Sequence, residues 1–317
     1  MNIHSRPDNK HAATGAGDVQ ARLMLGLLCL IWGVTWPMMK IALNEIPPLS
    51  MRTLTAGIGV SGLVVICLVT RRSLRVPMGR AWAHVVAASI LNVTGFSMLS
   101  AFAQIAAATS RVAILTYTMP IWALVLGWAI LGERPSRIQV IAILLCAIGI
   151  TVLILPLATG GVPIGILLAV VSGFSWAAGT VYLKWARIDA DPVGVATWQI
   201  AIAFVVIGGL MFAFDGGLDL SNAHAGAIWA VLFAGIAGNA IAYALWFDIV
   251  RRVPALTATL GVVGIPVIGV VSTMLIIGER LTVADTVGFA FIFAASVCAQ
   301  IPPSAFRRII DRSPAPV

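Results

Sequence analysis

The chain has 317 residues, of which 60% are hydrophobic and 10% are charged. Soluble domains carry charge on about a quarter of their residues, so this composition excludes a water-soluble fold and predicts an integral membrane protein. The net charge of +8 would suggest nucleic acid in a soluble protein, but here the basic residues form short clusters between apolar stretches, where they set membrane orientation. We expect a lipid bilayer and a small-molecule substrate as partners, and no nucleic acid.

Residues 1–21 are polar and lack the short apolar core of a signal peptide, so we interpret them as a cytoplasmic tail. Apolar stretches of about 20 residues, the length that crosses a bilayer as a helix, then recur almost to the end of the chain. They predict ten spans, at 22–43, 49–70, 81–106, 110–131, 138–157, 162–186, 193–213, 225–250, 254–277 and 283–303. Very short connections make consecutive helices antiparallel. The fold class is therefore all-α integral membrane, followed by a second tail at 304–317.

The basic residues also predict the orientation. With the first residue in the cytoplasm, only Lys40, Arg52, Arg111 and Arg280 of the 20 Lys and Arg residues fall at outer helix ends. Cytoplasmic loops carry the excess of Lys and Arg in membrane proteins. We therefore predict a multi-pass protein of the bacterial cell inner membrane, with both termini in the cytoplasm.

The chain contains an internal repeat. Leu-Gly-Glu-Arg at 131–134 follows the fourth span, and Ile-Gly-Glu-Arg at 277–280 follows the ninth. We therefore predict two five-helix repeats, at 22–157 and 158–303. Because five is an odd number, the second repeat crosses the membrane in the opposite direction to the first. Such inverted repeats are typical of transporters, which open one site to either side of the membrane.

The same register aligns Pro120 with Pro266, and Gly33-Val34-Thr35-Trp36 resembles Gly173-Phe174-Ser175-Trp176. A proline inside a helix removes a hydrogen bond and bends the chain. We predict that Pro120 and Pro266 are hinges, the alternative being simple kinks.

These features, five-span repeats with a proline in the fourth span and Gly-Glu-Arg at its end, resemble the EamA family of the drug/metabolite transporter (DMT) superfamily over residues 22–303. In overall character the chain is most similar to YddG-type exporters of aromatic and other neutral amino acids. The resemblance implies a central cavity surrounded by the first, third, fourth, sixth, eighth and ninth spans. The second, fifth, seventh and tenth spans are then peripheral.

Polar and aromatic residues at mid-membrane depth are the candidates for substrate binding, because unpaired polar groups there usually face protein or water. Trp36 and Trp176 could stack on an aromatic side chain, although Trp36 could also be an interfacial anchor. Asn92 and Asn239 could bind substrate or form interhelical hydrogen bonds. The ten predicted residues are Trp36, Asn92, Phe96, Ser100, Thr116, Tyr117, Trp176, Asn239, Tyr243 and Trp246.

Neither catalytic residues, a cofactor nor a metal site is predicted, because the cysteines and histidines are scattered without ligand spacing. No Asp, Glu, Lys or His lies clearly at mid-span, and no Lys or Arg is expected deep in the cavity. We therefore predict an uncharged cavity and a carrier of small neutral metabolites that works as a uniporter, without coupling to protons. The alternatives are a proton-coupled multidrug or other metabolite exporter of the same superfamily and, more remotely, an intramembrane enzyme. The sequence sets no oligomeric state and is compatible with a monomer.

Overall fold

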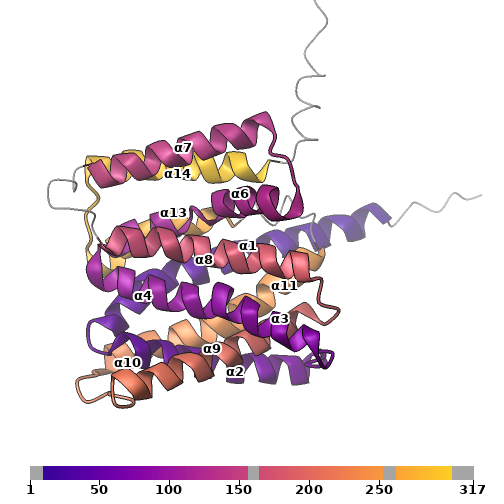
Figure 1. Cartoon of the computed structure of the whole chain (residues 1–317), viewed down its shortest axis with the longest axis vertical. Helices are drawn as coiled ribbons and strands as arrows, with labels where there is room; N and C mark the ends of the chain where they lie inside the picture. Colours follow the sequence, from indigo (N-terminus) through magenta and orange to yellow (C-terminus); the bar gives the residue numbers. More distant parts are fainter. Residues whose placement is uncertain (1–9, 156–163, 253–261, 302–317) are drawn as a thin grey trace, which may run out of the picture.

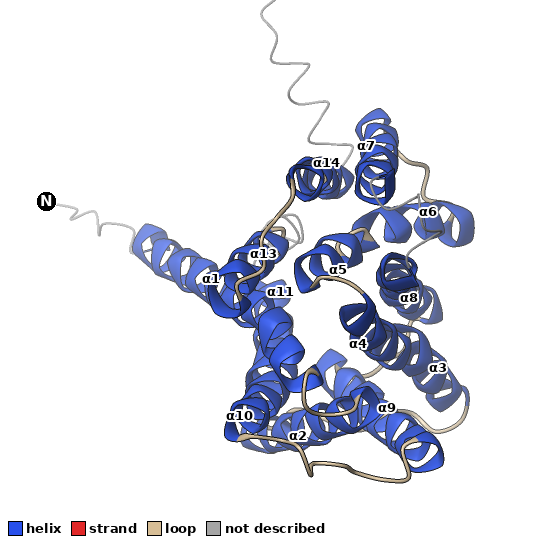
Figure 2. Ribbon diagram, turned by 90° about the vertical axis from the view of Figure 1, so that its left-hand side faces the viewer, coloured by secondary structure: helices blue, strands red, loops and turns tan. Residues whose placement is uncertain are grey.

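The computed structural model describes residues 10–155, 164–252 and 262–301, and all regular structure in these ranges is helical (Figures 1 and 2). In chain order the elements are α1 (Lys10–Leu43), α2 (Pro48–Val69), α3 (Arg80–Ser89), η1 (Ile90–Gly95), α4 (Phe96–Ala106), α5 (Thr109–Thr116), α6 (Met119–Leu131), α7 (Arg137–Ile154), α8 (Ile164–Ala186), α9 (Pro192–Phe214), α10 (Ala225–Phe233), η3 (Ala234–Ile241), α11 (Ala242–Arg252), α13 (Gly264–Ile277) and α14 (Val283–Gln300). The segments η1 and η3 are π-helical.

Nine helical stretches of the described residues are long and apolar enough to cross a membrane, and α13 adds a shorter apolar helix. The predicted all-α membrane fold is thereby confirmed. The predicted span 254–277 lies partly outside the described residues, and the predicted tail at 304–317 lies wholly outside them. One difference concerns a helix end. Helix α1 begins at Lys10, inside the predicted tail. The tail contains several alanines, which favour helix, so the helix of the first span extends back into it.

Consecutive spans run in opposite directions, so the bundle has two ends (Figure 1). One end carries Lys40, Thr109 and Glu279, and is called the Glu279 end below. The other carries Glu133 and Lys184, and is called the Glu133 end. The Gly-Glu-Arg motif ends α6 and α13, where Gly132 and Gly278 adopt φ of 70° and 72°. A left-handed glycine of this kind is a common helix C-cap, and it explains why both copies keep Gly before Glu.

The two repeats interlock through their first and fourth spans. Helix α1 packs on α13, and α8 packs on α5 and α6 (Figure 2). At each crossing the helix of the first span carries a glycine. A Cβ at Gly33 would lie 3.1 Å from the backbone nitrogen of Gly269, and one at Gly173 would lie 2.8 Å from the carbonyl oxygen of Thr116. Glycine therefore allows the same close backbone approach in both halves.

The π-helical segments form a second matched pair of contacts between the repeats. A π turn shifts the backbone hydrogen-bond register and leaves a carbonyl free for another donor. In η1 the Leu91 carbonyl accepts a hydrogen bond from the Ser175 hydroxyl of α8. In η3 the Gly238 carbonyl accepts one from the indole N–H of Trp32 in α1, at 3.0 Å. The third span of each repeat is thus bonded to the first span of the other.

The remaining spans lie at the edges. Helices α7 and α14 pack together on one side of the bundle, and α2 and α9 pack together on the opposite side (Figures 1 and 2). The first pair is peripheral, as expected for the fifth and tenth spans. The second and seventh spans also lie at the edge, but α2 and α9 contribute residues to the wall of the central cavity, which the expectation assigned to the other six spans.

Candidate functional site

A cavity of about 300 Å³ lies between the two repeats. Its aromatic wall consists of Trp32, Trp36, Phe96, Tyr117, Trp176, Tyr243 and Trp246. The rest of the wall is mostly apolar or small, and consists of Thr35, Met39, Arg52, Thr55, Ala56, Val93, Ser97, Met119, Thr180, Ile200, Ala203, Ile207, Gly238, Asn239, Val262 and Ile265. Helices from both repeats therefore form the wall, as a site served by two inverted halves requires.

Five of the aromatic rings form a continuous group. The ring of Trp176 lies 4.9 Å from that of Phe96 and 6.5 Å from that of Tyr243, measured between centroids. Trp32 lies 5.9 Å from Tyr243 and 6.3 Å from Trp246. These separations are in the range of favourable edge-to-face and tilted pairs, so the rings hold one another in place. The group presents rigid, weakly polar surface to the cavity.

Seven of the ten predicted substrate-binding residues line this cavity. They are Trp36, Phe96, Tyr117, Trp176, Asn239, Tyr243 and Trp246. Trp36 is only 6% exposed, so its interpretation as an interfacial anchor does not fit the structure. Asn239 also makes an interhelical bond, because its Nδ2 donates to the Thr55 carbonyl at 3.0 Å. The interhelical hydrogen bond of Asn239 is therefore confirmed, and substrate binding by this residue stays a prediction.

The structure corrects the other three predictions, because Asn92, Ser100 and Thr116 do not line the cavity. Asn92 is buried against α8, where its Nδ2 donates to the Trp176 carbonyl at 3.1 Å, so the alternative prediction of an interhelical hydrogen bond is the one that the structure supports. The hydroxyl of Thr116 is fully buried and donates to the Val112 carbonyl of its own helix at 2.7 Å. The hydroxyl of Ser100 is fully buried too, and it accepts a hydrogen bond from Arg52. In each case the polar group forms a hydrogen bond within the protein.

The sequence interpretation missed two residues that line the cavity, Trp32 and Arg52. Trp32 precedes Trp36 by four residues, a spacing that places both on one helix face, and this signal was present in the sequence. Arg52 was assigned to an outer helix end, yet it lines the cavity and is 8% exposed. The prediction of an uncharged cavity is therefore wrong. The long side chain of Arg52 reaches inward from a backbone position near the start of α2.

Pro120 and Pro266 occupy matching places near the start of helices. The fourth span is broken between α5 and α6, and Pro120 is the second residue of α6. Pro266 is the third residue of α13, and residues 253–261 before it lie outside the described ranges. Proline is favoured in the first turn of a helix, where its missing N–H leaves no bond unmade. Tyr117, at the break, lines the cavity.

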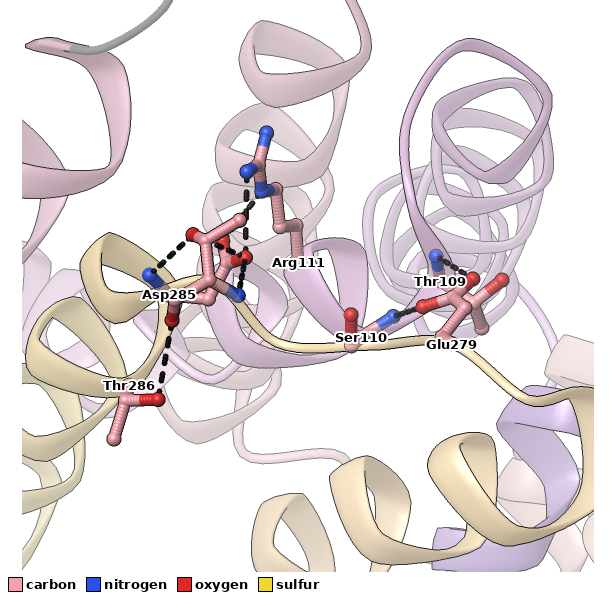
Figure 3. Close-up of polar contacts among 7 residues, drawn as sticks. Thr109, Ser110, Arg111, Glu279, Asp285 and Thr286 are labelled. Carbon is pink, nitrogen blue, oxygen red and sulfur yellow. Dashed lines mark hydrogen bonds and ion pairs between the residues drawn. The ribbon is translucent and has the colours of Figure 1, made fainter.

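At the Glu279 end, two acidic residues of the second repeat hold the start of α5 from the first (Figure 3). The carboxylate of Glu279 accepts hydrogen bonds from the backbone N–H groups of Thr109 and Ser110, at 2.8 Å and 2.9 Å. Arg111 forms a two-pronged ion pair with Asp285, whose side chain is 4% exposed. Asp285 also caps α14. Negative charge stabilises a helix N-terminus, and a bidentate Arg–carboxylate pair is stronger than a hydrogen bond between neutral groups.

The Glu133 end is joined differently. Glu133, the repeat counterpart of Glu279, forms an ion pair with Lys184, and the two side chains are 53% and 62% exposed. Exposed pairs of this kind contribute little. Arg72 and Asp191 form a second pair at this end, at 3.1 Å. Glu279 and its partners Thr109 and Ser110 are therefore more buried than Glu133 and its partner Lys184.

Comparison with known proteins places the chain among membrane transporters. The model of the EamA-like transporter family matches it twice, over residues 21–155 and 163–299. "Uncharacterized transporter YvbV" of Bacillus subtilis is 28% identical over 87% of this chain and 90% of its own. A "Probable amino-acid metabolite efflux pump" of Escherichia coli is 21% identical over 84% of this chain and 90% of its own. One solved crystal structure, 21% identical, has a TM-score of 0.64 over 92% of this chain and 99% of that one.

Proposed function

The chain belongs to the EamA-like transporter family, and from this premise we propose that it exports small metabolites, above all amino acids with aromatic or apolar side chains. The membrane is proposed to be the inner membrane of a bacterium, with both termini in the cytoplasm. The positively charged helix ends support this orientation, because cytoplasmic loops collect Lys and Arg. In this orientation the Glu279 end faces outward.

The aromatic cavity is the observation that carries the proposal. Its volume of about 300 Å³ is at the small end of ligand sites, which run from about 300 to 1,000 Å³. The rings of Trp32, Trp176 and Tyr243 can contact a flat apolar side chain without rearranging, since they already support one another. The printed name of the Escherichia coli relative, an amino-acid metabolite efflux pump, points to the same class of solute.

Alternating access is the proposed mechanism. The matched contacts of Gly33 and Gly173, and those of η1 and η3, allow the two halves to exchange arrangements. The Glu279 bonds to α5 would close the outer end in one arrangement and break in the other. The break at Tyr117 between α5 and α6 would let α5 move with less disturbance of α6.

Uncoupled transport is the proposed energetics. No Asp, Glu, Lys or His is found among the described residues that line the cavity, so the wall offers no side chain that would bind and release a proton near neutral pH. The solute would then run down its own gradient. Accumulation of solute against its gradient, driven by an imposed pH difference, would contradict this part of the proposal.

The test is counterflow of radiolabelled phenylalanine, leucine and glutamate in proteoliposomes. We expect phenylalanine and leucine to exchange and glutamate to fail. Trp176→Ala should lower phenylalanine exchange at least 10-fold, because it removes the ring that links Phe96 to Tyr243. Trp229→Ala is the matched control, since Trp229 is 70% exposed on the outer surface and is not part of the cavity. No exchange of any amino acid by wild-type protein would refute the proposal.

A further inference from the structure

Arg52 is buried in the wall of the cavity and lies well inside the bundle. It is the fifth residue of α2, and only 8% of it is exposed. The other ionisable side chains of the wall are tyrosines, so Arg52 supplies the positive charge among the described residues that line the cavity. Ionisable residues inside a membrane span are costly, and they usually mark a substrate or ion pathway.

The hydrogen-bond partners of Arg52 are neutral. Its Nη1 donates to the sulfur of Met39 at 3.1 Å, and its Nη2 donates to the hydroxyl of Ser100 at 2.8 Å. A thioether is a weak acceptor. The Nε–H is buried without a partner. A guanidinium has five N–H donors, so three of them remain for another acceptor.

Arg52 differs in this respect from other basic residues of the bundle. Arg72, Arg111, Lys184 and Arg252 each form an ion pair with a carboxylate. Arg52 has no carboxylate within ion-pair distance among the described residues. It is nevertheless more deeply buried than the four basic residues that have one. A buried charge without a counter-charge lowers stability. A bound anion would supply the counter-charge, and the cavity is where it could enter.

We propose that Arg52 binds the carboxylate of the transported solute, and that the transporter selects for this group. The inference rests on the function proposed above and adds a specificity determinant to it. Met39, which contacts the guanidinium, lies one helical turn from Trp36, so the charged group and the aromatic wall adjoin. A guanidinium matches a carboxylate with two parallel hydrogen bonds. The solute class is therefore a small molecule with one carboxylate and an apolar or aromatic body.

The test compares phenylalanine with phenylalaninamide, which has the same ring and ammonium group and no carboxylate. Wild-type proteoliposomes should exchange the acid about 10- to 100-fold better than the amide, the range expected for hydrogen bonds to a charged group. Arg52→Gln should abolish this preference by lowering exchange of the acid and sparing the amide. Arg52→Lys keeps the charge without the planar fork and should keep part of the preference. Arg75→Gln, at an exposed loop position, is the control and should behave as wild type.

A purely structural role for Arg52, as a tie between α1, α2 and α4, makes a different prediction. In that case Arg52→Gln lowers exchange of acid and amide by the same factor and lowers thermal stability, and the inference is overturned. It is also overturned if wild type and Arg52→Gln discriminate equally while amino acids are still transported, a result that leaves the proposed function intact.

Binding separates the remaining outcomes. The melting temperature of the purified protein is measured with 3-phenylpropionate, an apolar carboxylate without an amino group. If wild type exchanges no amino acid but 3-phenylpropionate stabilises wild type and not Arg52→Gln, the amino-acid proposal fails and the carboxylate site stands. If there is neither exchange nor stabilisation, both fail.

Discussion

Glu279→Gln should open the Glu279 end of the transporter. In the structure the Glu279 carboxylate receives two backbone N–H bonds from the start of α5, at 2.8 Å and 2.9 Å. A glutamine has one acceptor oxygen and no charge, so it loses one bond and weakens the other. Hydrogen bonds to charged groups are worth about 1.5–3 kcal/mol, against about 0.5–1.5 kcal/mol between neutral groups. The lost charge at the helix N-terminus adds about 0.3–1 kcal/mol.

The sum is about 3 kcal/mol in favour of opening, or roughly a 100-fold change in the equilibrium between the two arrangements. Minor conformations that matter for function are typically populated at about 0.1–10%. An open state near 1% would therefore become about as populated as the closed one. The repeat counterpart Glu133→Gln is the matched control, because its exposed ion pair with Lys184 is worth no more than about 1 kcal/mol.

The distance across this end can be measured by pulsed electron paramagnetic resonance between spin labels at Ala108→Cys and Arg280→Cys. Both positions are exposed, and they flank the bonds in question. The native cysteines Cys29, Cys67 and Cys146 would first be replaced, together with Cys298. We expect a single short distance in the parent and a second, longer one in Glu279→Gln. The reasoning is refuted if Glu279→Gln gives the same distance distribution as the parent and as Glu133→Gln.

Three further substitutions test the packing between the repeats, each by thermal unfolding in detergent. Gly173→Ala should destabilise by about 1–3 kcal/mol, because its Cβ would lie 2.8 Å from the Thr116 carbonyl, whereas Gly209→Ala has open space and should be neutral; equal effects would contradict this. Arg111→Leu should cost about 3 kcal/mol by leaving the buried Asp285 unpaired, and Lys184→Leu, which breaks an exposed pair, less than about 1 kcal/mol; the reverse order would be fatal to the argument. Ser175→Ala should cost about 1 kcal/mol by leaving the Leu91 carbonyl without its α8 donor, and no loss would mean that the π turn satisfies this carbonyl in another way.

The helices and the repeat were accessible from the sequence because lipid imposes strict requirements on the chain. Spans must be apolar and about 20 residues long, and a duplicated motif survives in Gly132 and Gly278, where a left-handed C-cap needs glycine. The cavity was accessible in part for the same reason. Trp176 and Tyr243 carry polar N–H and O–H groups at mid-membrane depth, and such groups are expected to face protein or a cavity rather than lipid. Both residues line the cavity.

The wrong predictions concern residues whose side-chain direction does not follow from their spacing in the sequence. Asn92 and Phe96 would share a face in a regular α-helix, but Asn92 lies in the π-helical segment η1, which changes the number of residues per turn between them, so spacing in the sequence no longer gives the face. Asn92 consequently faces α8, while Phe96 faces the cavity. Arg52 was misplaced because depth was counted from the helix boundary, and a long side chain reaches well beyond its own backbone position.

Exposure of one cavity position to both sides of the membrane tests the central claim most directly. Ala56→Cys lines the cavity, and Val205→Cys, at a position 68% exposed on the outer surface of α9, is the lipid-facing control. In proteoliposomes of defined orientation, a membrane-impermeant thiol reagent is applied from one side at a time. Alternating access predicts that Ala56→Cys reacts from either side, that saturating phenylalanine protects it, and that Val205→Cys stays unreactive. Reaction of Ala56→Cys from one side alone, with or without phenylalanine, would contradict the account.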